Sequence, residues 1–459
     1  MLMALILVLS LVPVFPVLAA DPVTVYIDPK NGSNDNAGTE ESPVQNFTKA
    51  YEFLQEGGGT VIMLSSVYYA GTYTFPACDY PVTITGKTGA EGIRTGSNIV
   101  VSGDTTFQNM TFTMNKASVS TLICGNGHKL VMGEGLTCVP FVEGSNSYYF
   151  CLQGSSVSPT GTGADMTILS GQYRNVYAGA SAKTVNGDVR LTMTGGTASV
   201  VSASYSSAVN GDVEISLSGS ANVTTVYAGA WLKSAVGNVT VTLGQGAKVK
   251  NLYSAGNGTG NVTSTTVILD GYDQSLSNLK GTGGAPYTGT LGSSTLLLKS
   301  GTLRANPVGF TNVHVEVPRD KTLTLAAEVS ADTLKSEGSL CFSGPARLTA
   351  GAVTGSVACT IAGDVLKNQV YVTAPAGSAI SFPTETGITE RSGQWVNHDL
   401  TDFAGLVVAS DSANKLNLYG GIWAHGTSTV YTIVEPYFTE TVDGITYRYY
   451  PNATGDYHV

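Results

Sequence analysis

Charged residues are scarce in this chain of 459 residues, and basic residues are the scarcer kind. Asp, Glu, Lys and Arg together make up 12%, well below the usual ~25%. The formal net charge is -10 and no run of Lys or Arg occurs, whereas a nucleic-acid-binding protein needs clustered basic residues for the phosphates. We therefore exclude nucleic acid as a partner, and the same composition argues against other polyanions.

Cysteine is also rare, and its spacing excludes several kinds of site. No two cysteines form a Cys-x-x-Cys pair, so zinc and thioredoxin-like redox sites find no support. The sparse spacing is unlike the disulfide framework of a short secreted domain. We expect most cysteines to be buried as small apolar residues. The six are Cys78, Cys124, Cys138, Cys151, Cys341 and Cys359.

Familiar catalytic motifs are missing as well. The sequence has no P-loop, no dinucleotide-binding fingerprint and no HExxH zinc motif. Its five histidines are scattered, so they assemble neither a catalytic triad nor a metal pair. No catalytic residue can be named, and the question of an enzyme stays open with a non-catalytic role favoured.

Long apolar runs are confined to the N-terminus. Met1 to Ala20 is apolar and ends in small residues of the kind that signal peptidase requires. A membrane span is the rival interpretation, but Pro13 and Pro16 interrupt the run and polar sequence follows at once. We interpret residues 1–19 as a signal peptide, although no Lys or Arg precedes the run. The expected location is extracellular or at the cell surface, without a membrane span after signal removal.

Glycine, by contrast, is abundant, with 55 residues, and it marks the corners of a repeat between Asp165 and Gly271. One set of strand-like segments contains Met166, Val189, Val213 and Val239, which follow one another at nearly constant steps of roughly 25 residues. A second set between them begins at Val176, Val200, Val226 and Leu252. A repeat of this length, with short strands and glycine corners, is typical of one coil of a β-solenoid.

Alternation gives each strand of the repeat an inner and an outer face. In Val189–Met193, Val213–Leu217 and Val239–Leu243, every second residue is apolar. The apolar set must face the interior of the coil, because a slip by one residue would expose all of it. Coils stacked roughly 4.8 Å apart then form inner ladders of aliphatic side chains. We predict an all-β fold, a right-handed parallel β-helix over residues 20–381.

Both ends of such a solenoid need covering, because open strand edges invite aggregation. After the strand-like Val23–Ile27, apolar residues recur at helical spacing over Phe47–Leu54, and Gly57–Gly59 ends that segment. We predict an N-terminal capping helix there. In residues 382–459 the repeat is lost, and we expect a small C-terminal β cap or the start of a further module.

Two stretches resemble a known superfamily. Tyr26–Pro29, with Ser42–Pro43 and the glycines before Val61, resembles the opening of pectin-lyase-like right-handed parallel β-helix proteins. Phe107–Thr113 and Gly127–Gly133 are similar to coils of that superfamily, in particular to adhesin-like surface proteins of gut-type Gram-positive bacteria. The resemblance implies the fold, but the superfamily hosts lyases, hydrolases, adhesins and tailspikes alike, so it leaves the activity open.

Aspartates recur at the corners of the repeat. Asp165, Asp188 and Asp212 take corresponding places in three coils, with Asn238 in the fourth. Three stacked carboxylates would lie close enough to share a cation, and the expected ion is Ca²⁺. The interpretation we favour is that Asp or Asn after Gly caps the corner turn. We therefore expect no cofactor, and a calcium site remains the alternative.

Aromatic residues recur in the second strand set. If the aliphatic first residue points inward, then Tyr177, Val201, Tyr227 and Tyr253 point outward as a column, and Trp231 extends it. Tyrosines on a solenoid face can stack on sugar rings and hydrogen-bond through their hydroxyls. The competing interpretation is cross-strand aromatic stacking without a ligand, which sheets use routinely.

The leading hypothesis from the sequence is a secreted, non-catalytic, adhesin-like β-helix whose Tyr177, Tyr227, Tyr253 and Trp231 bind a polysaccharide or cell-surface glycan. A second hypothesis is a polysaccharide lyase or glycoside hydrolase, which rests on the superfamily resemblance alone. A third is a passive structural spacer within a longer cell-surface protein.

Overall fold

The computed structural model describes residues 21–155, 163–366, 369–385 and 387–397, together with the backbone of short strands between residues 407 and 458. The chain divides into two compact units, residues 1–213 and 214–459, and each is considered separately. The predicted signal peptide, residues 1–19, lies outside the described residues. Within the predicted C-terminal segment, side chains are described only as far as residue 397.

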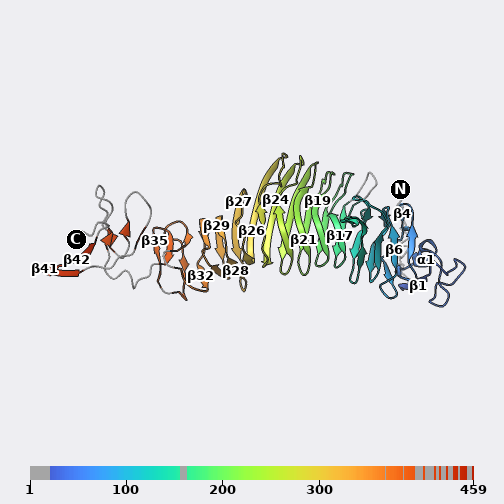
Figure 1. Ribbon diagram of the computed structural model, residues 1–459, viewed down its shortest axis with the longest axis horizontal. Coiled ribbons are helices and arrows are strands. Elements are labelled where there is room, and N and C mark those ends of the chain that lie inside the picture. Colours follow the sequence, from blue (N-terminus) through green and yellow to red (C-terminus); the bar gives the residue numbers. More distant parts are fainter. Residues whose placement is uncertain are drawn as a thin grey trace, which may run out of the picture. The chain divides into compact units, whose positions relative to one another are not determined.

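The first unit is built from three ladders of parallel strands (Figure 1). The longest ladder contains β1 (Val23–Ile27), β2 (Gly59–Met63), β5 (Val82–Gly86), β8 (Thr105–Gln108), β11 (Lys129–Met132), β16 (Ala164–Ile168) and β18 (Val189–Met193). The second contains β4 (Tyr73–Thr74), β7 (Ile99–Val100), β10 (Leu122–Cys124), β15 (Cys151–Gln153), β17 (Gln172–Tyr177) and β19 (Thr197–Ser204). The third contains β3 (Val67–Tyr69), β6 (Gly92–Thr95), β9 (Thr111–Met114) and β12 (Thr137–Val139). An antiparallel hairpin, β13 (Phe141–Glu143) and β14 (Asn146–Tyr148), follows β12.

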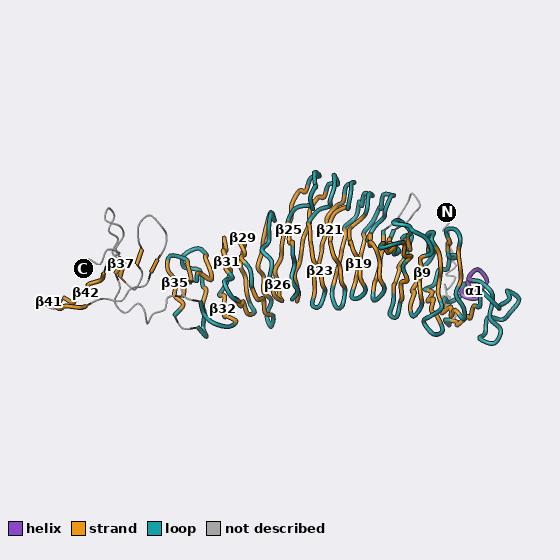
Figure 2. The backbone as a smooth tube through the Cα atoms, in the orientation of Figure 1, coloured by secondary structure: helices purple, strands orange, loops and turns teal. Residues whose placement is uncertain are grey.

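The single helix of the described residues, α1 (Phe47–Leu54), lies where the sequence predicts it (Figure 2). The Asn46 side chain caps it by accepting a hydrogen bond from the backbone N–H of Lys49 at 2.9 Å. Phe47, Ala50, Tyr51 and Leu54 form its buried face. Phe47 packs edge-on against Phe75, with ring centroids 4.9 Å apart.

The interior of the first unit is aliphatic with a chain of aromatic rings. Phe75, Phe107, Phe112 and Phe150 follow one another with centroid separations of 5.7, 5.2 and 6.1 Å. All four are essentially fully buried. The alternation predicted for Val189–Met193 is confirmed, since its three apolar residues are buried and the residues between them are not.

The second unit starts with its longer repeats. β20 (Val213–Leu217) crosses the boundary between the units. One parallel ladder contains β22 (Val236–Gly244), β24 (Val262–Tyr272) and β26 (Leu291–Leu303). The other contains β21 (Asn222–Ala230), β23 (Lys248–Tyr253) and β25 (Asn278–Lys280). Val241 pairs with Val267, and Val267 pairs with Leu296. These partners lie farther apart in the sequence than the paired residues of the later strands, such as Val315 and Leu334.

After β26 the repeat shortens and two ladders continue. One contains β27 (Asn312–Val317), β29 (Glu328–Ser336), β31 (Arg347–Thr354) and β33 (Val370–Thr373). The other contains β28 (Thr322–Leu325), β30 (Ser339–Ser343), β32 (Val357–Ala362) and β34 (Ile380–Ser381). β26 pairs with the first strand of both ladders. Val315 pairs with Leu334, a clearly shorter step along the chain than the one from Val267 to Leu296.

An antiparallel hairpin, β35 (Ile388–Arg391) and β36 (Gln394–Asn397), follows the parallel strands. β36 pairs antiparallel with β33, and the buried Trp395 donates from Nε1 to the carbonyl of Ile380 at 3.2 Å. This hairpin covers an edge that β33 would otherwise leave open. Further short strands pair antiparallel: β37 (Val407–Val408), β38 (Leu418–Tyr419), β39 (Trp423–Ala424), β40 (Tyr431–Thr432), β41 (Phe438–Val442), β42 (Ile445–Pro451) and β43 (Tyr457–His458).

The all-β prediction with parallel ladders is confirmed, but part of the predicted strand register is wrong. The sequence aligns Met166 with Val189, whereas the structure pairs Met166 with Leu191 and Ala164 with Val189. Both alignments place the same apolar side chains inside, because an even shift in register preserves the face of every residue. The second strand set shows an odd shift, described below with the site.

Candidate functional site

The outer face of β21, β23 and β25 brings together two of the predicted aromatic residues. Tyr227 and Tyr253 pair directly in the register of β21 and β23, and Tyr253 pairs with Lys280 on β25. The two phenol rings stack with centroids 5.3 Å apart and planes inclined by 17°. We name Tyr227 and Tyr253 the tyrosine row. The prediction that Tyr227 and Tyr253 adjoin is confirmed.

Trp231 adds a ring at one end of the row, and Lys280 adds a charge at the other. The Trp231 ring lies 6.4 Å from the Tyr227 ring at 15°, and Lys280 Nζ lies 6.0 Å from the centroid of the Tyr253 ring. That position is within the range of a cation–π contact. All four side chains are half-buried. Burial raises the pKa of Tyr227, and the adjacent Tyr253 adds to the increase, so the Tyr227 hydroxyl is protonated at neutral pH.

The loops after β21, β23 and β25 stack on one another beside this row. The Asn257 amide donates to the carbonyl of Trp231 at 2.7 Å, and the Gly284 amide donates to the carbonyl of Gly256 at 3.0 Å. A Cβ on Gly284 would lie 2.9 Å from a ring carbon of Tyr227 and 3.1 Å from Asn257 Oδ1. Only glycine lets this loop approach the Tyr227 ring so closely.

Tyr177, in the first unit, does not have the predicted outward exposure. Its side chain is 5% exposed, its hydroxyl accepts a hydrogen bond from Asn175 Nδ2 at 3.0 Å, and its ring lies 5.4 Å from that of Tyr205. Alternation along β17 gives the direction of the side chain but says nothing about the groups that pack over it. Tyr177 is therefore corrected from a surface residue to a buried one.

Val201 does not belong to the predicted column. The register pairs Val176 with Val201, and Tyr177 with Ser202. Val201 is fully buried and lies on the inner face. The alignment of Val176 with Val200 was wrong by one residue, which reverses the face of every later residue in that strand.

The aspartate ladder is also arranged differently from the prediction. The register places Asp165 opposite Arg190, not in line with Asp188. Asp188 accepts a hydrogen bond through Oδ1 from the backbone N–H of Asp212 at 3.0 Å, a contact between the corners of two neighbouring repeats. Within the part of the chain that the structure describes, no three Asp, Glu, His or Cys side chains are grouped to hold a metal ion.

A groove of about 380 Å³ lies on the same strands as the tyrosine row. We name it the lysine groove, because Lys248 and Lys250 on β23 are its only charged residues among those described. Both lysines are exposed, and the intervening Val249 is buried, so the two side chains project from the same face. The other lining residues are Asn222, Val223, Thr224, Gln274 and Ser275.

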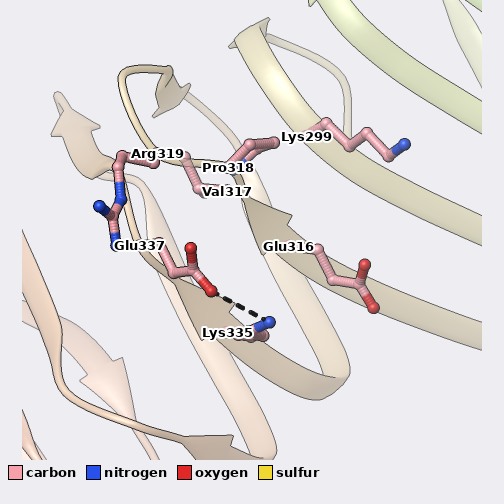
Figure 3. A pocket seen from close by; sticks show the side chains of 7 residues that line it. All are labelled: Lys299, Glu316, Val317, Pro318, Arg319, Lys335 and Glu337. Carbon is pink, nitrogen blue, oxygen red and sulfur yellow. Dashed lines mark ion pairs between the residues drawn. The ribbon is translucent and has the colours of Figure 1, made fainter.

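A second concavity, of about 280 Å³, lies on β26, β27 and β29 and carries charges of both signs (Figure 3). The Lys335 ammonium lies 3.2 Å from the Glu337 carboxylate, the ion pair drawn dashed in Figure 3. Glu316 pairs with Lys335 in the strand register. The lining residues are Lys299, Glu316, Val317, Pro318, Arg319, Lys335 and Glu337. Internal pairing of this kind leaves less net charge for a ligand than the lysine groove offers.

Sequence reasoning missed the lysines of this face. Lys248 and Lys250 are visible as a Lys-Val-Lys alternation, whereas Lys280 comes beside Tyr253 only through the register of β23 and β25. No helix of the described residues is long and apolar enough to cross a membrane. No family model matches this chain, and neither the curated proteins nor the solved structures contain a match.

Proposed function

We propose that this chain is a secreted right-handed parallel β-helix of the pectin-lyase-like type that binds a glycan on its surface, as an adhesin does. The observation that carries the binding proposal is the tyrosine row with its flanking Trp231. Support for the solenoid comes from the parallel ladders, to which successive repeats contribute one strand each. Parallel crossover connections are right-handed in nearly all proteins.

The row supplies the groups that a sugar ring uses. Partly exposed aromatic rings offer apolar surface to the C–H groups of a pyranose, and phenol hydroxyls hydrogen-bond to its hydroxyls. The rings of Tyr227 and Tyr253 stack with their centroids 5.3 Å apart, so a sugar contacts the ring surface that this stacking leaves free, together with the hydroxyls. Their mutual stacking also holds the site in one arrangement before the ligand arrives, which lowers the entropic cost of binding.

The test is glycan-array binding by the double variant Tyr227→Ala/Tyr253→Ala. We expect a loss of at least about tenfold in affinity for the glycans that the natural chain retains, equivalent to about 1.4 kcal/mol. The matched control is Tyr68→Ala, because Tyr68 is 59% exposed and lies in the other unit. Circular dichroism confirms that each variant is folded. Unchanged binding by the double variant, or no glycan bound by the natural chain, would contradict the proposal.

A further inference from the structure

Asparagine is followed directly by glycine at five places in the chain, and at two of them the surrounding sequence is the same. Asn186 and Asn210 each stand in a Val-Asn-Gly-Asp-Val segment, at the corner before β18 or β20. We infer that Asn186 is a site of spontaneous modification, in which the backbone nitrogen of Gly187 attacks the side-chain amide and the resulting ring hydrolyses to aspartate or isoaspartate. The other three asparagines are Asn31, Asn126 and Asn257.

The reaction needs water and no other co-reactant. The Gly187 nitrogen forms a bond to Cγ of Asn186 and gives up its proton, while the bond from Cγ to Nδ2 breaks and ammonia leaves with that proton. The product is a cyclic imide. Water then adds to one of the two imide carbonyls and the C–N bond at that carbonyl breaks, which leaves a carboxylate on either an aspartate or an isoaspartate. Attack within one chain is favoured because the two reacting groups are already held together.

The attacking nitrogen must be free of hydrogen bonds and open to solvent. Glycine has no side chain that would shield its nitrogen. Among the described residues, none accepts a hydrogen bond from the amide of Gly187 or from that of Gly211. The side chains of Asn186 and Asn210 are exposed, so water reaches the ring for the second step. Both pairs therefore meet the first requirement of the reaction.

Neighbouring repeats hold the two segments in matching positions. Val185 and Val209 form a parallel β-bridge, and both are buried. The Asn210 amide donates to the carbonyl of Val185 at 2.9 Å, and the Val189 amide donates to the carbonyl of Asp212 at 2.8 Å. The backbone is therefore fixed on both sides of these Asn-Gly pairs, and the two asparagine side chains lie next to each other.

A hydrogen bond between these side chains sets Asn186 apart from Asn210. Asn210 Nδ2 donates to Asn186 Oδ1 at 2.6 Å. The bond withdraws electron density from Cγ of Asn186, and it strengthens as negative charge develops on Oδ1 during the attack. In the described part of the chain no group donates in the same way to Oδ1 of Asn210. We therefore expect Asn186 to react before Asn210.

Hydrogen bonds block the same reaction at two other places. The Gly32 amide donates to the carbonyl of Asp28 at 2.8 Å, and the Gly127 amide donates to the carbonyl of Gly154 at 3.1 Å. Such a nitrogen must lose its hydrogen bond before it can attack, and the carbonyl is then left without its partner. We expect the asparagines before these two glycines to be protected while the chain is folded.

Asn257, in the second unit, is an intermediate case. No described residue accepts a hydrogen bond from the Gly258 amide, and none donates to Oδ1 of Asn257. This pair thus has a free nitrogen without an activating donor, as Asn210 has. The five pairs therefore form three groups, which differ in the nitrogen and in the donor while the reacting dipeptide stays the same.

The modification changes the charge of the corner where it occurs. A carboxylate replaces a neutral amide in two segments that already carry the exposed Asp188 and Asp212. Isoaspartate also lengthens the main chain, because the side-chain carbon becomes part of it. We expect the protein to become a mixture of differently charged forms as it ages.

The experiment is peptide mapping of the full chain by mass spectrometry during storage at neutral pH. Trypsin places each of the five Asn-Gly pairs in a different peptide, and Thr184–Arg190 contains Asn186 as its only asparagine. We expect Asn186 to be converted at least about threefold faster than the two asparagines with a free nitrogen and no donor, and at least about tenfold faster than the two blocked ones. These differences should disappear in the chain unfolded in guanidinium. Fragmentation of the Thr184–Arg190 peptide should show isoaspartate, because only the ring produces it.

Two variants test the hydrogen bond. Asn210→Ala removes the donor, and Asn210→Asp keeps the shape of the side chain while its carboxylate cannot donate. We expect each to slow the conversion of Asn186 in the folded chain by at least about threefold and to leave it unchanged in guanidinium. The matched control is Asn257→Ala, which removes an Asn-Gly pair of the other unit and should leave the rate at Asn186 unchanged. Circular dichroism confirms that each variant is folded.

Three results would overturn the inference. The first is a folded chain in which Asn186 reacts no faster than Asn31, or more slowly than Asn210. The second is aspartate without isoaspartate in the Thr184–Arg190 peptide, which would show direct hydrolysis of the side chain and not attack by Gly187. The third is an unchanged rate at Asn186 in both Asn210 variants, which would show that the hydrogen bond does not activate it.

Discussion

Asp28 shows how a single side chain organises the N-terminal loop. Its carboxylate accepts hydrogen bonds from the backbone amides of Lys30 and Asn31 at 3.0 and 3.2 Å, from Asn31 Nδ2 at 3.1 Å and from the Ser65 hydroxyl. Burial alone would raise the pKa of Asp28, but the hydrogen bonds from Ser65, Asn31 and Lys30 together hold it below its usual value. The loop that follows β1 is thus tied to the segment after β2 through Ser65.

The lowered pKa of Asp28 predicts a pH-dependent contribution to stability. A carboxyl group whose pKa is lower in the folded state stabilises the fold above the unfolded pKa of about 3.9. That contribution is lost as the pH falls through the lower folded value. We expect Asp28→Asn to lower the melting temperature at neutral pH, and the difference from the natural chain to shrink as the pH falls below the unfolded pKa. Thermal melts followed by circular dichroism across this range measure it.

The control for this prediction is Asp35→Asn, in the same loop, where the side chain is exposed. It should leave the melting temperature close to that of the natural chain at every pH. A difference between the natural chain and Asp28→Asn that stays constant from neutral to acidic pH would mean that the charge on Asp28 does not contribute.

At the residue scale, the sequence predicts which side chains face inward more reliably than which outer side chains reach solvent. The buried sets at Val189–Met193 and at Phe47–Leu54 follow from periodicity, because water penalises every apolar residue on the wrong face. Tyr177 has an outward direction in the same pattern but is buried, with the ring of Tyr205 against it. The exposure of an outer side chain depends on loops, whose paths alternation does not encode.

The helix α1 is the element whose boundaries the sequence predicts best. Its apolar spacing and the glycines after it indicate the same segment, and the structure adds the Asn46 cap at its start, an agreement typical of a locally specified element. Its C-terminus is closed by a hydrogen bond from the Gly58 amide to the carbonyl of Leu54 at 2.8 Å, with Gly58 at φ +72°. A left-handed conformation of this kind favours glycine.

We expect Asn46→Ala to destabilise the fold by about 1 kcal/mol, because the Lys49 amide loses its hydrogen-bond acceptor. Urea unfolding followed by far-ultraviolet circular dichroism measures the change in midpoint. Asn46→Asp is the matched variant, since its carboxylate can accept the same hydrogen bond, and it should retain most of the stability. Equal destabilisation by both substitutions would show that the cap does not act through this acceptor.

For the strands, the apolar alternation in the sequence predicts where a strand lies and which of its residues face inward. The register between two strands depends on the neighbouring repeats. The pairing of Val226 with Leu252 agrees with the sequence alignment, but that of Val176 does not. The strands beyond β26 are similar aliphatic segments, yet the step from Leu296 to its partner Val313 is far shorter than the preceding step to Leu296. The longer and the shorter repeats each contribute two strands, so the connecting segments set much of the repeat length, and alternation within the strands does not encode the lengths of these segments.

At the scale of the whole molecule, the state of the cysteines shows whether packing or disulfide bonds stabilise the fold. All six carry reduced thiols, and four of them are buried, in agreement with the expectation that they act as small apolar residues. Cys78 and Cys124 donate to the carbonyls of Leu54 and Ser155. The stability of both units therefore derives from the ladders and their interiors, so we expect no change of melting temperature on addition of a reductant.

Maleimide labelling, with the adducts counted by intact mass, measures how many thiols are accessible and whether any of them forms a disulfide. The thiolate is the reactive form, and burial raises the pKa of Cys138 and Cys151 to about 11 and that of Cys359 to about 12. Cys341 lies on the partly exposed side of β30. We expect one rapid adduct on the folded chain, which Cys341→Ser removes, and six adducts after unfolding without reductant. Fewer than six adducts after unfolding would reveal a disulfide. Several rapid adducts on the folded chain would show that the interiors of the two units open far more readily than their packing implies.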